Sequence, residues 1–305
     1  MNNLSLVVGA LGPIFALILL GLGLRRLGFP GDGFWPAVER FTYFLLFPAL
    51  LVHRLATARL DQYAVGPVAA IIVAQLLGMT ALTYALRPWL KVDGPAFSSV
   101  YQGAIRFNTY VGLAVALAVF HAEGGTAAAL VMAIMIPLIN VLCVLVLNAH
   151  AGGSATVNGV MRGLIANPLI LACLTGIGLN LSGIGLPGGS AAVLEILARA
   201  ALPLGLLAVG AGLRLEGLRR PGLLATASAL KLLVLPALVA TLCWLVQPGA
   251  LETAVLVTFA ALPGASTAYI LARQLGGDAP LIAAIVTVET AAALVTLPAV
   301  LVWVV

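Results

Sequence analysis

The sequence has 305 residues, of which 62% are hydrophobic and 8% are charged, and its formal net charge is +5. Soluble domains average about 25% charged residues, so a water-soluble fold of this size is excluded. A mean hydropathy of +1.16 indicates instead an all-α integral membrane protein. A nucleic-acid partner is also excluded, because no basic patch with interleaved aromatic residues lies outside the apolar segments.

Apolar segments of about 20 residues, the length that crosses a bilayer, recur along the chain and predict ten transmembrane helices. The predicted spans are 6–24, 34–56, 64–86, 95–121, 126–148, 163–182, 190–213, 222–246, 250–275 and 279–303. The connection at 149–162 is short and glycine-rich. It is predicted to be a linker between two five-helix halves, 1–148 and 163–305.

The basic residues of the short loops predict the orientation of these helices. One side of the membrane would carry Arg25, Arg26, Arg87, Lys91, Arg162, Arg214, Arg219 and Arg220. The other side would carry only Arg54 and Arg59. The first side is therefore predicted to be cytoplasmic, together with the linker, and both termini are predicted to be non-cytoplasmic.

Three sequence matches in the same order relate the two halves. They pair segment 13–30 with 168–187, the FPALL motif at Pro48 with LPLGLL at Pro203, and the segment from Gly124 with that from Gly276. The first two pairs share an offset of 155 residues. Because each half has five spans, the second copy would be inverted in the membrane, as in many secondary transporters.

The fourth and ninth predicted helices are interrupted. Residues 106–110, RFNTY, are too polar to face lipid, and residues 263–267, PGAST, combine a helix breaker with a flexible residue and two hydroxyls. Lipid cannot satisfy the backbone groups that a break frees, and matching breaks in two repeats point to a transporter site. The N-terminus of each half-helix would suit an anion. The alternative is a kink whose freed groups are satisfied by Ser and Thr side chains.

Four segments resemble bacterial members of the auxin efflux carrier family: RFNTYVGLAVA, ALPGASTAYILARQLGGDAPLIAAIVT, NPLILACLTGIGLNLSGIGLP and GPIFALILLGLGLRRLGF. The resemblance covers essentially the whole chain. It implies two inverted five-helix repeats, similar to bile acid/sodium symporters, in which helices 4 and 9 cross at their breaks beside the substrate. It also implies a scaffold domain of helices 1, 2, 6 and 7, and a transport domain of helices 3–5 and 8–10 that moves like an elevator.

The same resemblance implies a location in the bacterial inner membrane and a small organic anion as substrate. Bacterial members are commonly assigned to malate or malonate, and plant members to auxin. Plant members often have proline at both breaks, whereas the fourth helix here has Asn108-Thr109. The expected partners are the anion and the lipid bilayer, with a homodimer through the scaffold domain as one candidate assembly.

Substrate-binding candidates surround the two breaks. They are Arg106, Asn108, Thr109, Tyr110, Pro263, Ser266, Thr267 and Tyr269. Arg106 is expected to meet a substrate carboxylate, and the alternative is that it caps carbonyls freed at the crossing.

Candidates for ion coupling are polar residues at membrane depth, where an ionisable group costs about 2.5–3.5 kcal/mol on insertion scales. They are Glu289, Lys231, Asn140, Gln75 and Gln102. Glu289 is the leading candidate for a coupling proton, and a buried Lys231–Glu289 ion pair is the alternative. The three amides suit Na⁺ or substrate, or else hydrogen bonds between helices. The coupling ion is expected to be H⁺ or Na⁺, and neither a metal site nor another cofactor is expected.

Two further pairs of charges favour structural ion pairs. Glu39 and Arg40 lie near the start of the second predicted helix, and Glu195 and Arg199 are spaced i, i+4 in the seventh.

The favoured function is secondary active transport of a small mono- or dicarboxylate by an elevator mechanism, either proton-coupled or as a uniporter. A sodium-coupled symporter of a larger organic anion is the alternative on the same fold. Other classes are a non-transporting membrane receptor and an intramembrane enzyme. The enzyme is disfavoured because no His follows Ser266 in the chain and no HExxH motif is present.

Overall fold

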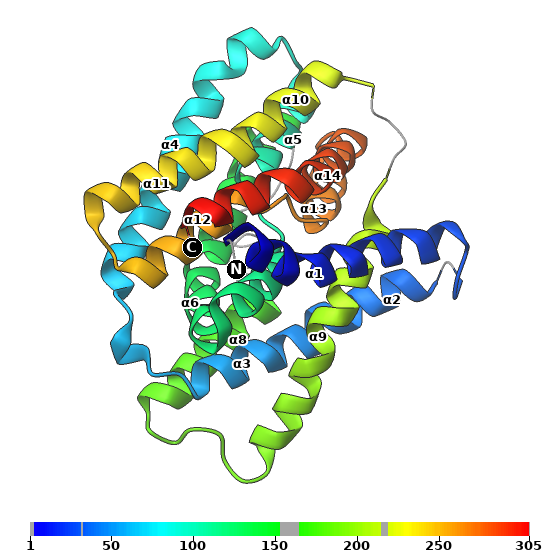
Figure 1. Ribbon diagram of the computed structural model, residues 1–305. Helices are drawn as coiled ribbons and strands as arrows, with labels where there is room; N and C mark the ends of the chain where they lie inside the picture. The colour runs from blue at the N-terminus through cyan, green and yellow to red at the C-terminus, as the bar shows by residue number, and fades with distance from the viewer. Residues whose placement is uncertain (1–2, 32, 153–164, 215–218, 305) are drawn as a thin grey trace.

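The computed structural model describes residues 3–31, 33–152, 165–214 and 219–304. Within these ranges the secondary structure is helical and contains no strand (Figure 1), which confirms the all-α class. Most of the predicted linker, residues 153–162, lies outside the described residues, and so does the predicted cytoplasmic Arg162.

The first half of the chain contains six α-helices and a π-helical turn, η1, among its described residues. Their bounds are α1 Asn3–Arg26, α2 Phe34–Phe41, η1 Thr42–Leu46, α3 Phe47–Ala56, α4 Val65–Leu90, α5 Gly94–Ile105 and α6 Thr109–Ala151. A short 3₁₀ turn, Leu60–Gln62, precedes α4. Within α6, His121 has non-helical angles, φ 57° and ψ −148°, at the point where the fourth predicted helix ends.

The second half contains seven α-helices and a second π-helical turn, η3, among its described residues. The bounds are α8 Pro168–Leu181, α9 Ser190–Gly212, α10 Pro221–Ala229, η3 Leu230–Val234, α11 Leu235–Val246, α12 Ala250–Ala261, α13 Thr267–Leu275 and α14 Ala279–Val304. Every predicted span thus overlaps a helix of the structure.

The two π-helical turns have a common cause. Pro48 and Pro236 stand at the second positions of α3 and α11, and proline has no N–H to donate. The carbonyl four residues earlier, inside η1 or η3, therefore lacks its usual partner, and the helix widens there. These wide turns contain Tyr43 of η1 and Lys231 of η3.

Six described stretches are apolar and long enough to cross a membrane, judged by length and composition. They are Ser5–Arg26, Val65–Leu90, Gly94–Ala151, Ser190–Gly212, Pro221–Val246 and Ala279–Val304. Gly94–Ala151 is 58 residues long, more than twice the length that one crossing requires. These stretches support an integral membrane protein.

The helices pack mainly in two groups, which α1 also joins through its contact with α14. α1 packs on α9, and α3 packs on α8 and α9, whereas α5, α12 and α13 pack on α14, and α4 packs on α11. Figure 1 shows α3 and α9 at one end of the molecule and α4 and α10 at the other. α6 contacts both groups. The division into a fixed and a moving domain stays a prediction.

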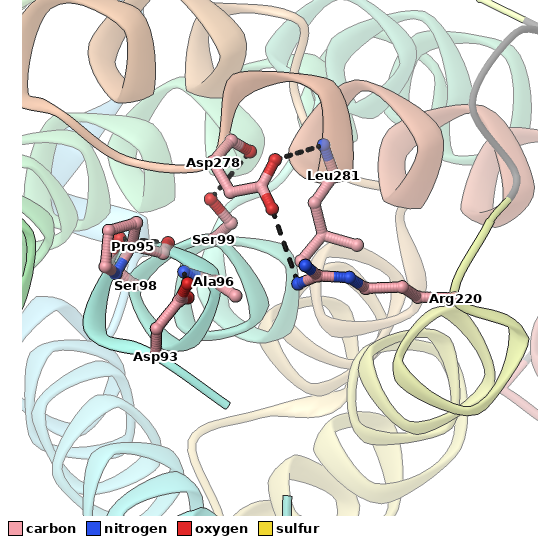
Figure 2. Close-up of polar contacts among 8 residues, drawn as sticks. All are labelled: Asp93, Pro95, Ala96, Ser98, Ser99, Arg220, Asp278 and Leu281. Carbon is pink, nitrogen blue, oxygen red and sulfur yellow. Dashed lines mark hydrogen bonds and ion pairs between the residues drawn. The ribbon is translucent and has the colours of Figure 1, made fainter. Parts of the chain in front are cut away.

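Polar contacts join the starts of α5 and α14 (Figure 2). Asp93 Oδ1 accepts a hydrogen bond from Ala96 N, and Asp278 Oδ1 accepts one from Leu281 N, both at 3.0 Å. Ser99 Oγ donates to the Asp278 carbonyl at 2.9 Å. Arg220, at the start of α10, lies 3.6 Å from Asp278 Oδ2. The starts of α5, α10 and α14 are thereby held together.

Candidate functional site

The first break separates α5 from α6. α5 ends at Ile105, and residues 106–108 leave the helix before α6 begins at Thr109. Asn108 starts the new helix, because its Oδ1 accepts hydrogen bonds from Tyr110 N at 3.1 Å and Val111 N at 3.2 Å. A side-chain cap of this kind satisfies N–H groups that a helix start leaves free. The break therefore forms without proline.

The second break separates α12, which ends at Ala261, from α13, which begins at Thr267. Two fully buried charged residues satisfy backbone groups that this break frees. Glu289 Oε2 accepts a hydrogen bond from Gly264 N at 2.8 Å, and Lys231 Nζ donates one to the Ala260 carbonyl at 3.0 Å. Glu289 and Lys231 therefore stabilise the interruption from the side of α14 and η3.

The two breaks meet through their backbones. Asn108 N donates a hydrogen bond to the Pro263 carbonyl at 2.9 Å. The rings of Phe107 and Phe259 lie beside this contact, with centroids 5.4 Å apart. Segments far apart in the sequence are thus joined where each helix is open.

A cavity of about 130 Å³ lies next to this crossing. Both breaks line it, together with residues of α2, η1, α9 and the start of α8. The first break contributes Arg106, Asn108, Thr109 and Tyr110. The second break contributes Ser266 and Thr267, and the middle of α6 contributes Asn140. These seven side chains all belong to the residues singled out from the sequence.

Arg106 is the cation of this cavity, and it is only 8% exposed. Its Nη2 donates to Asn140 Oδ1 at 2.5 Å, and its Nη1 donates to Gln102 Oε1 at 3.4 Å. A guanidinium has five N–H donors in a fixed fork. The two amides thus orient Arg106 and leave it further donors for a ligand.

The cavity offers more polar groups that suit an anion. Thr109 and Thr267 line it from the first turns of α6 and α13, where the helix dipole places partial positive charge. Ser266 Oγ and Tyr110 Oη are buried and have no hydrogen-bond partner within the described part of the chain. Buried polar groups normally have a partner, so these two hydroxyls keep an unused hydrogen-bonding capacity beside the cavity.

Comparison with known proteins identifies the family of this chain. Residues 6–301 match the family described as "Membrane transport protein". The chain belongs to this family, the auxin efflux carrier family. An "Uncharacterized transporter" of Methanothermobacter thermautotrophicus is 28% identical over 294 residues, covering 93% of this chain and 94% of the relative. A "Putative malonate transporter" of Rhizobium meliloti is 27% identical over 286 residues, covering 88% of this chain and 87% of the relative. The chain is thus a membrane transporter and not an enzyme.

Several predicted site residues of this transporter lie outside the cavity. Gln102 contacts it only through Arg106, and Pro263 contributes its carbonyl to the crossing. The Arg214 guanidinium lies over the Tyr269 ring, with its Cζ atom 4.5 Å from the ring centroid. Gln75 is buried on α4, where its Nε2 lies 3.8 Å from the sulfur of Met135. Gln75 and Tyr269 are thus held by partners away from the lining.

Glu289 and Lys231 also lie outside the cavity, and they form no direct ion pair with one another. Each is bonded to a backbone group of the second break instead. Glu289 Oε1 is buried and has no hydrogen-bond partner among the residues that the structure describes. Each of the two charges therefore has a backbone partner at the second break.

The cavity of the transporter includes three polar residues that were not predicted: Glu39, Tyr43 and Asn167. Glu39 forms no ion pair with Arg40, since adjacent helical residues point in different directions. The predicted pair of Arg199 and Glu195 is confirmed, at 2.6 Å. The sequence contains one indication of these residues. Glu39 and Tyr43 are spaced i, i+4, so they share a helix face.

Proposed function

We propose that this transporter carries a small organic anion by secondary active transport across the bacterial inner membrane. The substrate would be a mono- or dicarboxylate of the malate, malonate or auxin type. The observation that carries the proposal is the convergence of Arg106 with the N-termini of α6 and α13 at one cavity. The Rhizobium meliloti relative, whose name refers to malonate, supports a short dicarboxylate.

The size of the cavity supports a small substrate. Pockets for drug-sized ligands have volumes of about 300–1,000 Å³, whereas this cavity has about 130 Å³. A short organic acid suits that volume better than the larger anion of the sodium-coupled alternative.

The position of the cavity supports an elevator mechanism. Its lining comes from α2, η1, α8 and α9 on one side and from both breaks on the other. These are the predicted scaffold and transport domains. A displacement of one group past the other would carry a substrate held at the breaks from one side of the membrane to the other. The proposal also includes the predicted orientation, in which the linker is cytoplasmic and both termini are non-cytoplasmic.

Transport would be proton-coupled or uniport. Glu289 is the coupling candidate, because one of its carboxylate oxygens holds Gly264 N while the other has no hydrogen-bond partner. It lies directly behind the second break, so a change in its protonation state would act on the backbone that lines the cavity.

A ligand-stabilisation screen of the purified full-length protein tests the substrate class. Malonate, malate and monocarboxylates should raise the melting temperature by mass action. A ligand present at a hundred times its Kd stabilises the folded protein by about 2.7 kcal/mol. Arg106→Gln should abolish this shift. The matched control is Arg199→Gln, which removes an exposed arginine of α9 outside the cavity and should leave the shift intact. A screen that is flat for every anion would contradict the proposal.

A further inference from the structure

The cavity contains a carboxylate as well as a guanidinium. Glu39 of α2 lines the same cavity as Arg106. Its side chain is partly buried, and its carboxylate makes no hydrogen bond and no ion pair with any residue that the structure describes. An anion bound to Arg106 therefore shares its small cavity with a second, uncompensated acidic group.

The groups around Glu39 are few. α2 packs against η1 and α9. η1 brings Tyr43 to the cavity, whereas α9 brings only the uncharged Ala208 and Val209. The remaining titratable or charged groups of the lining are Tyr110 and Arg106. No second cation of the described chain is present there to neutralise Glu39.

Tyr110 lies within the electrostatic reach of Glu39. Its ring is fixed by an edge contact with Phe47, with centroids 4.9 Å apart, and by close packing against Gly205 of α9. Its hydroxyl is nevertheless buried, and no described residue forms a hydrogen bond with it. The Glu39 side of the cavity thus offers a carboxylate acceptor and the Tyr110 hydroxyl, neither of which bonds to any residue in the described ranges.

We propose that Glu39 sets the charge of the transported species, so that the cavity accepts an organic monoanion and rejects a dianion. The carboxylate of the substrate pairs with Arg106, and its far end presents an uncharged hydrogen-bonding group to Glu39 and Tyr110. This inference rests on the proposed function, since it takes an organic anion as the substrate.

For a short dicarboxylate, the accepted form is the hydrogen-carboxylate. Its O–H donates to the Glu39 carboxylate, whereas the dianion would place a second charge against Glu39 in a poorly solvated site. The proton that neutralises the far carboxyl then crosses the membrane on the substrate. Such transport moves a proton without a change in the protonation state of Glu39.

Equilibrium binding of malonate and of malonamate, its monoamide, to the purified full-length protein tests the proposal. Malonamate keeps one negative charge at every pH above its single ionisation. Above the second ionisation of malonate, its apparent affinity should fall about tenfold for each pH unit, because the monoanion fraction falls by that factor. The affinity for malonamate should stay constant over the same range.

Glu39→Gln should remove the fall in malonate affinity, because the dianion no longer meets a like charge. Glu195→Gln is the matched control, since it makes the same change on an exposed part of α9, and it should keep the wild-type profile. The wild-type comparison decides the question even if Glu39→Gln does not fold. Equal affinity of the wild-type protein for malonate below and above its second ionisation would overturn the inference and leave the proposed function intact. Binding of neither compound, nor of any other acid, would overturn both.

Discussion

At the scale of single residues, Arg106 combines a charge with a fixed orientation. Its guanidinium is held by Asn140 and Gln102, at 2.5 and 3.4 Å. Lysine keeps the charge but has no planar fork, so it cannot hold both amides and a carboxylate in the same geometry. Arg106→Lys should therefore weaken malonate binding by about tenfold or more, as measured by calorimetry. The control Arg199→Lys should bind as the wild type does, and an unchanged Kd for Arg106→Lys would show that the fork is not used.

Two variants of Glu289 separate its hydrogen bond to Gly264 N from its proposed role in proton coupling. In Glu289→Gln an amide oxygen can still accept from Gly264 N, so the protein should fold and bind substrate. Liposome uptake of malonamate, whose far end has no carboxyl proton to carry, should no longer respond to an imposed pH gradient. Glu289→Ala leaves that N–H unsatisfied and should cost about 1–3 kcal/mol of stability. Malonamate uptake by Glu289→Gln that still follows the gradient would remove Glu289 from the coupling mechanism.

The sequence reveals some of the lining residues, for a physical reason. Arg106 and Ser266 stand out because polar residues inside apolar segments need a partner other than lipid. Glu39 does not stand out, because it lies near the end of a segment beside Arg40, where charges are ordinary. Its place in the cavity follows from the packing of α2 against α9, which no local pattern specifies.

At the scale of helices, the positions of the spans follow from apolar length, and the second break follows from Pro263-Gly264. The first break is harder to predict, since it depends on how Asn108 caps α6 and binds Pro263 across the fold. The π-helical turns are also hidden in the sequence. Proline reveals a missing N–H, but the local helix geometry decides whether the turn widens or kinks.

The crossing of α1 and α9 depends on two glycines that allow close backbone contact. A Cβ on Gly210 would lie 1.8 Å from the Ile18 carbonyl oxygen, and a Cβ on Gly21 would lie 2.1 Å from that of Leu207. Small residues of this kind let membrane helices approach closely. Gly210→Ala should force α1 away from α9 and lower the melting temperature of the purified protein.

The matched control is Gly23→Ala on the same helix α1, where an added Cβ meets nothing within 4 Å. It should not lower the melting temperature, since alanine is the better helix former by about 1 kcal/mol in water. Equal melting temperatures for Gly210→Ala and Gly23→Ala would contradict the close crossing.

At the scale of the whole molecule, an elevator mechanism requires α9 and the second break to move past one another. Gly212, the last residue of α9, lies beside Ser266: a Cβ on Gly212 would be 3.9 Å from Ser266 Cβ. That separation falls within the range of about 3.5–4.5 Å found in disulfides. The double variant Gly212→Cys/Ser266→Cys should therefore cross-link on oxidation, and uptake should stop until a reductant is added.

The design of this experiment separates blocked movement from a blocked site. The native Cys143, Cys173 and Cys243 are buried, so the background of cross-linking should be low. The reduced double variant should transport like the single variant Ser266→Cys, which carries the same change in the cavity. After oxidation, malonate binding should persist while uptake is lost, because the cross-link fixes the two groups of helices but leaves Arg106 in place. Continued uptake by fully cross-linked protein would show that α9 and the second break need not separate, and the elevator mechanism would then fail for this transporter.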